Sequence, residues 1–99
     1  ALGSPFITAC ANSLANNSYD SGIEKYAQGN YQGAIADFNQ AIEINPQYAN
    51  AYYNRGLAKY DLKHYQGAIS DYTKAIEINP QFADAFNNRG YIKMNSKDY

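Results

Sequence analysis

Side chains able to perform catalysis are few in this sequence and lie far apart. The only cysteine, Cys10, stands near the start of the chain, and the only histidine, His64, stands in its second half. They are not expected to act together, and they cannot supply the three or four protein ligands of a zinc site. As a general base, His64 would need a nucleophile or an acid beside it. Its counterparts in the repeats described below, Asn30 and Asp98, share with it only the ability to cap a helix.

Composition also argues against a reaction centre. Asp37 and Asp71 stand at equivalent positions of successive repeats, which favours surface charge or ion pairing over two carboxylates in one site. Eight Lys+Arg against nine Asp+Glu give a formal charge of −1, so binding to nucleic acid or to an anionic membrane is not predicted. Eleven tyrosines and twelve asparagines, with no tryptophan, are typical of polar-aromatic contact surfaces. The sequence predicts a protein that is not an enzyme and holds no metal and no cofactor.

The chain repeats itself at a fixed period. Residues 15–48 and 49–82 are identical at nineteen of 34 positions, and such self-similarity is the signature of a repeat architecture. A third copy begins at Ala83 and matches the second at eight of 17 positions up to Tyr99. We therefore divide the chain into an N-terminal extension (1–14), repeat 1 (15–48), repeat 2 (49–82) and the first helix of a third repeat (83–99).

Each repeat is predicted to form two amphipathic helices. In repeat 2, Tyr53, Leu57 and Tyr60 stand at i, i+4 and i+7. The second helices are predicted to end at Asn45 and Asn79 because the residue before a proline leaves the α region. Residues 12–18 are predicted to be a flexible, polar connector. The predicted helices span 16–28, 31–45, 49–62, 65–78 and 83–96, with ends uncertain by about 2–4 residues.

A glycine recurs in the middle of each first helix, at Gly22, Gly56 and Gly90. Each costs about 1 kcal/mol relative to alanine. The recurrence predicts a close approach between the two helices of a repeat, with alanines of the second helix opposite the glycine.

The spacing of these residues resembles the tetratricopeptide repeat. The resemblance covers residues 15–99 and implies an all-α, right-handed solenoid of antiparallel helix hairpins, about two and a half repeats long. The matching positions are an aromatic residue, glycine, alanine, Phe or Tyr, alanine and proline. They are Tyr52, Gly56, Ala68, Tyr72, Ala75 and Pro80, preceded by Gly22, Ala34, Phe38, Ala41 and Pro46 and followed by Phe86 and Gly90.

The first helices depart from the family pattern at two places. Polar residues replace the usual leucine before the glycine and the usual aromatic residue three positions after it. In repeat 2 we expect Arg55 to compensate by pairing with Asp71 on the facing helix, within about 6 Å. The departures are Ser21, Arg55 and Arg89 before the glycine, and Lys25, Lys59 and Lys93 after it.

By resemblance, the first helices line a concave groove that binds a peptide or helix of a partner protein. Tyrosines would form its pockets, and the side-chain amides of Asn54 and Asn88 would pair with a peptide backbone. The alternatives are that the tyrosines pack in the core and that the asparagines are solvated helix residues. The predicted groove residues are Tyr19, Ile23, Tyr26, Tyr53, Asn54, Leu57, Tyr60, Asn87, Asn88 and Tyr91, with Met94 beside them.

A subfamily of these domains grips the acidic C-terminal tails of heat-shock chaperones. The matching set in this chain would need a lysine at Tyr19, an asparagine at Ile23, a lysine at Asp84 and an arginine at Asn88, and only Asn54 fits. Binding of a carboxylate tail is therefore disfavoured. The runner-up function is self-association through the last helix, because a solenoid end without a polar cap exposes apolar area.

The N-terminal segment carries no charge from Ala1 to Tyr19. Its apolar stretch is too short to span a bilayer. Residues 7–10 resemble a bacterial lipoprotein signal, which makes Cys10 a candidate lipidation site, although the basic region of such a signal is absent. We expect an excised piece of a longer bacterial precursor, with export (periplasmic or lipoprotein-anchored) favoured over the cytoplasm.

Overall fold

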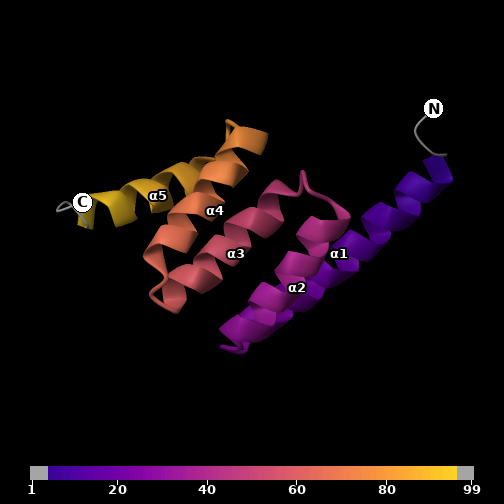
Figure 1. Cartoon of the computed structure of the whole chain (residues 1–99), viewed down its shortest axis with the longest axis horizontal. Coiled ribbons are helices and arrows are strands. Elements are labelled where there is room, and N and C mark those ends of the chain that lie inside the picture. The colour runs from indigo at the N-terminus through magenta and orange to yellow at the C-terminus, as the bar shows by residue number, and fades with distance from the viewer. Residues whose placement is uncertain (1–4, 96–99) are drawn as a thin grey trace.

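The computed structural model describes residues 5–95, with side chains from Cys10 onward. These residues form α1 (Pro5–Ala27), α2 (Tyr31–Ile44), α3 (Ala49–Asp61), α4 (Tyr65–Ile78) and α5 (Ala83–Asn95), and no strand. Consecutive helices pack against each other along an elongated body (Figure 1). The predicted all-α solenoid of helix hairpins is confirmed.

The helices of the repeats begin and end within one or two residues of the predicted positions, except at the start of α1. Asn45 and Asn79, each followed by a proline, are extended and end α2 and α4. Asn30 caps α2, since its side chain accepts a hydrogen bond from the Gly33 amide at 3.0 Å. The expected cap by His64 is wrong, because its side chain makes no such bond to α4. Asp98 lies outside the described residues.

The predicted connector over residues 12–18 is wrong, because α1 runs without a break from Pro5 to Ala27. Proline suits the first position of a helix, where its missing N–H has no helical partner in any case. From there to Gly22 the sequence contains no further proline and no glycine, and asparagine and serine weaken a helix only slightly. Ala15 of α1 is fully buried.

The core of each hairpin is a buried aromatic ring between alanines. Phe38 in repeat 1 and Tyr72 in repeat 2 are almost completely buried. A Cβ added at Gly22 would lie 2.6 Å from the Phe38 ring, and one at Gly56 would lie 2.7 Å from the Tyr72 ring. The predicted close approach is therefore found at these two glycines, but the ring of the second helix, more than its alanines, occupies the space. At Gly90 no described atom lies within 4 Å of such a Cβ.

The early glycines of the second helices are also crowded. A Cβ at Gly33 would lie 2.5 Å from the capping side chain of Asn30. A Cβ at Gly67 would lie 3.1 Å from the stem of Lys59. The absence of a side chain at Gly33 leaves room for Asn30, which caps α2. The absence of a side chain at Gly67 leaves room for the stem of Lys59 beside the start of α4.

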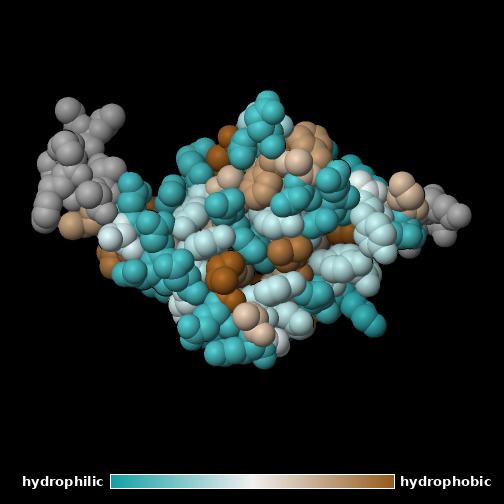
Figure 2. Space-filling view, turned by 180° about the vertical axis from the view of Figure 1, so that it is seen from behind, coloured by the Kyte–Doolittle hydropathy of each residue, from teal (hydrophilic) through white to brown (hydrophobic). Residues whose placement is uncertain are grey.

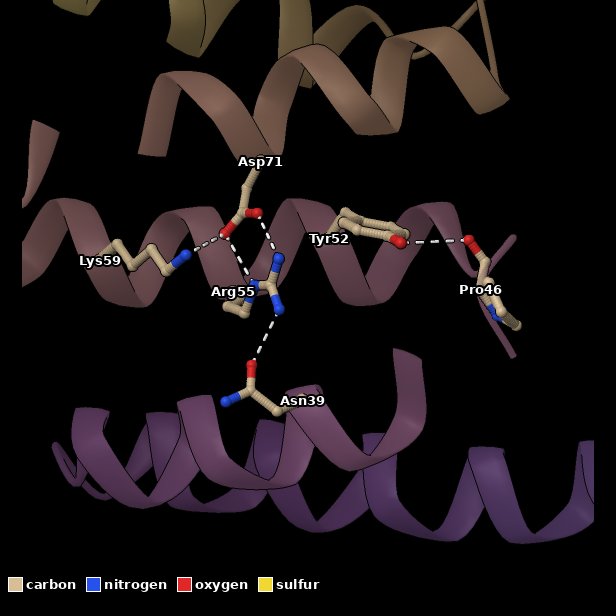
Figure 3. A network of polar contacts seen from close by, with 6 residues as sticks. All are labelled: Asn39, Pro46, Tyr52, Arg55, Lys59 and Asp71. Carbon is tan, nitrogen blue, oxygen red and sulfur yellow. Dashed lines mark hydrogen bonds and ion pairs between the residues drawn. The ribbon is translucent and has the colours of Figure 1, made fainter. Parts of the chain in front are cut away.

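In repeat 2 the two polar departures of α3, Arg55 and Lys59, form ion pairs with Asp71 of α4 (Figure 3). Arg55 donates from Nε to Asp71 Oδ2 at 2.9 Å and from Nη2 to Asp71 Oδ1 at 2.6 Å, which confirms the predicted pair. Lys59 Nζ lies 3.1 Å from Asp71 Oδ2. Arg55 Nη1 also donates to Asn39 of the preceding repeat, at 2.8 Å. Because Asp71 is only 3% exposed, this network replaces apolar packing between α2, α3 and α4.

The neighbouring repeats hold weaker versions of the network. In repeat 1, Ser21 donates to Asp37 at 2.6 Å and Lys25 lies 3.0 Å from the same carboxylate oxygen. On α5, Arg89 donates to Thr73 of α4 at 3.1 Å. Several cations of the first helices are thus directed toward the second helices.

Candidate partner-binding site

The first helices of successive repeats are joined by hydrogen bonds between residues 35 apart. Asn54 Nδ2 donates to the Tyr19 hydroxyl, and Asn88 Nδ2 donates to the Tyr53 hydroxyl, both at 2.9 Å. Tyr26 donates to Asp61 Oδ2 at 2.5 Å. These bonds place α1, α3 and α5 beside one another on one side of the molecule.

The sequence analysis missed these hydrogen bonds between successive first helices, which we call the ladder. Its sequence signal is a tyrosine followed by an asparagine 35 positions later, one residue more than the repeat period, at Tyr19/Asn54 and Tyr53/Asn88. The amide nitrogens of Asn54 and Asn88 are therefore engaged within the chain. Asn54 Nδ2 also donates to the Asn50 carbonyl oxygen at 2.9 Å, so a peptide backbone could pair with Asn54 only through its amide oxygen unless one of these bonds breaks. At Asn88 the bond to Tyr53 uses one of the two N–H groups of the amide.

A pocket of about 300 Å³ opens where these first helices meet α4. Five of the ten predicted groove residues line it, and Asp61, Tyr72 and Ile92 are liners that the sequence analysis did not name. Figure 2 shows the face of the molecule opposite to that of Figure 1, with hydrophobic and intermediate side chains gathered near its middle. The predicted liners are Tyr26, Leu57, Tyr60, Asn88 and Tyr91.

The other predicted groove residues lie outside the pocket lining. Tyr19 is half-buried and stacks on Tyr48 with ring centroids 4.9 Å apart. Tyr53 is likewise half-buried, 4.9 Å from the ring of Phe82.

The remaining predicted side chains also stay at the surface. Ile23 is 37% exposed, and Asn87 and Met94 are exposed. None of the predicted tyrosines is completely buried, so the first helices keep an accessible aromatic surface.

Two phenols of the pocket, those of Tyr26 and Tyr72, have raised pKa values. Burial raises the pKa of Tyr26, and the hydrogen bond to Asp61 and the charge of that carboxylate raise it further. Burial likewise raises the pKa of Tyr72, with smaller contributions from neighbouring tyrosines and from Asp61. At neutral pH these side chains therefore act as uncharged donors and acceptors with apolar ring faces.

The described residues offer little for other kinds of site. Within residues 5–95, no group of three metal-ligating side chains lies together. No helix among them is long and apolar enough to cross a bilayer. Cys10 and His64 are exposed, on α1 and before α4. The lipidation of Cys10 stays a prediction.

Comparison with protein families identifies the repeats. A model described as "TPR repeat" matches residues 22–63, and two described as "Tetratricopeptide repeat" match residues 49–82 and 71–99. The chain belongs to the tetratricopeptide repeat family. This family consists of protein–protein interaction modules. No curated protein sequence matches the chain.

Solved structures with the same fold include MamA. It superposes with a TM-score of 0.84 at 30% identity, over 87% of this chain and 50% of that one, so this chain spans about half the length of MamA. The TPR2B domain of yeast Sti1 in complex with pHsp70 gives a TM-score of 0.82 at 28% identity, covering 88% and 70% of the two chains. The second TPR of Spaghetti (RPAP3), bound to the HSP90 peptide SRMEEVD, gives 0.83 at 25%, covering 88% and 81%.

Proposed function

We propose that the chain binds a segment of a partner protein, without catalysis, in the concave surface formed by α1, α3 and α5. The observation that carries this proposal is the pocket of about 300 Å³ at the junction of the three helices. Its volume stands at the lower end of the range for small-ligand sites, which suits one anchoring side chain of a longer segment. Half-buried tyrosines on either side would extend the contact.

Relatives with peptides bound support this proposal. The RPAP3 domain is solved with an HSP90 peptide and the Sti1 domain with pHsp70. The acidic tail in the RPAP3 complex is a poor model for the partner of this chain, because Tyr19, Ile23 and Asp84 stand where the corresponding cations and amide would be needed. We therefore propose the same surface with a different ligand chemistry.

The test is selection of peptides from a random displayed library on the wild-type chain, followed by affinity measurements on two variants. Tyr91→Ala removes an exposed ring that lines the pocket, and Phe86→Ala removes an exposed ring of the same helix outside it. We expect Tyr91→Ala to weaken binding about tenfold, as truncation of a central aromatic contact does, and Phe86→Ala to change it less than about twofold. Equal effects of both variants, or none, would refute binding at the pocket.

Self-association is the competing function, because α5 exposes Phe86, Tyr91 and Met94 at 43%, 59% and 74%. Light scattering over a hundredfold range of concentration separates the two. A monomer throughout supports peptide binding, whereas a dimer lost on Met94→Ala but indifferent to Leu57→Ala supports assembly through α5.

A further inference from the structure

The pocket described above has a single charged side chain in its lining, the carboxylate of Asp61. Asp61 is the last residue of α3, and Tyr26, which donates to it, stands one residue before the end of α1. The C-terminal end of a helix carries a partial negative charge. The C-terminal ends of α1 and α3 and the carboxylate of Asp61 therefore all contribute negative electrostatic potential near the pocket.

Within residues 5–95, Asp61 forms no ion pair. The nearest cation along its own helix, Lys59, is engaged with Asp71 at 3.1 Å on the side of the second helices. Arg55 and Lys25 are engaged there as well. The packing of the hairpins thus separates the charges, with several cations directed away from the pocket and the acid beside it.

The walls of the pocket also suit a cation. Tyr26, Tyr60, Tyr72 and Tyr91 line it, and the face of a neutral phenol ring attracts an ammonium or guanidinium group. The charge of Asp61 contributes to the raised pKa of Tyr26, Tyr60 and Tyr72, after the larger effect of burial and, for Tyr60 and Tyr72, of neighbouring tyrosines. Leu57 and Ile92 supply apolar surface for an aliphatic stem.

We propose that this pocket accepts the side chain of a lysine or arginine from the partner segment, with its stem between Leu57 and Ile92 and its charged end against Asp61 and the tyrosine rings. The inference rests on the proposed function and names the chemistry of the partner. The proposed cationic side chain differs in charge from most of the charged residues in SRMEEVD, the HSP90 peptide of the RPAP3 complex.

The test uses Nα-acetyl amino-acid methylamides as probes, with chemical shifts of the backbone amides of Leu57 and Tyr91 as the readout. We expect the lysine and arginine probes to shift these amides and the norleucine and glutamate probes to bind several-fold more weakly. In Asp61→Asn the amide oxygen can still accept from Tyr26 while the charge is lost. This variant should weaken lysine binding about fivefold, the factor for one partly exposed charge pair.

Asp84→Asn is the matched control, because it removes the same charge from an exposed position on α5 outside the pocket lining. We expect it to change lysine binding less than about twofold, since screening by salt weakens a distant charge. Equal losses in the two variants, or a glutamate probe that binds as tightly as lysine, would overturn the proposal. The comparison of lysine with norleucine on the wild-type chain needs no variant and tests it independently of any effect on folding.

The two proposals fail in distinguishable ways. If library-selected peptides lose affinity on Tyr91→Ala but need no lysine or arginine, the concave site stands and its preference for a cation is wrong. If the selected peptides are indifferent to Tyr91→Ala, both proposals fall.

Discussion

Replacing Asp71 by asparagine tests whether the polar network holds repeat 2 together. Asp71 accepts two hydrogen bonds from Arg55 and lies 3.1 Å from Lys59. Its side chain is 4% exposed, against 18% for Arg55 and 25% for Lys59. Asparagine keeps the shape but leaves two cations side by side without their counterion.

The expected loss lies between two limits. Breaking a fully buried pair costs about 3–5 kcal/mol, and an exposed pair contributes at most about 1 kcal/mol. Because Arg55 and Lys59 can regain some hydration, we expect Asp71→Asn to lower the free energy of unfolding by about 2–3 kcal/mol. For a chain of this size that is a fall in Tm of about 10–20 °C.

Urea and thermal unfolding followed by circular dichroism at 222 nm give both quantities. Asp37→Asn is the matched control in repeat 1, where Lys25 is 39% exposed, and it should cost about 1 kcal/mol or less. A double-mutant cycle with Arg55→Met should give a coupling to Asp71 above about 1 kcal/mol. A coupling below about 0.5 kcal/mol, or equal losses at Asp37 and Asp71, would refute the reasoning.

Two further predictions concern a glycine pair and a carboxylate. Gly56→Ala places a Cβ 2.7 Å from the Tyr72 ring and 3.3 Å from the Ala68 carbonyl oxygen, so this variant should destabilise the chain by about 1–3 kcal/mol. In Gly90→Ala the new Cβ meets no described atom within 4 Å, so this variant should stabilise the chain by about 0.5–1 kcal/mol. Denaturation of both variants checks this, and a loss at Gly90 would contradict it. Burial alone would raise the pKa of Asp37, but the hydrogen bonds from Ser21 and Lys25 and the Lys25 charge outweigh it and lower the pKa below its ordinary value of 3.8. The stability that Asp37 contributes should therefore be fully present above pH 3.8 and be lost as the pH falls through the lower pKa that Asp37 has in the folded chain. Asp37→Asn should remove the contribution of this carboxylate to the acid dependence of unfolding.

The sequence alone determined the repeat, the second helices and the Arg55–Asp71 pair. The constant period of the repeat fixes which positions are equivalent, and proline fixes where α2 and α4 end. Arg55 and Asp71 were predictable as partners because a hairpin brings residues at equal distances from its turn to the same level. These features follow from the local geometry of the chain, so they can be predicted from a single sequence.

Tertiary structure decided the length of α1, the ladder between repeats and the composition of the pocket. Residues 12–18 have no strong local preference, so nothing in their sequence marks the helix that the structure shows. The step of 35 residues from Tyr26 to Asp61 depends on how one hairpin is translated and rotated onto the next. Tyr72 is a core residue by its pattern and is 1% exposed, yet it also lines the pocket together with residues of α1, α3 and α5. Contacts between repeats arise from this stacking, which periodicity along the chain does not specify.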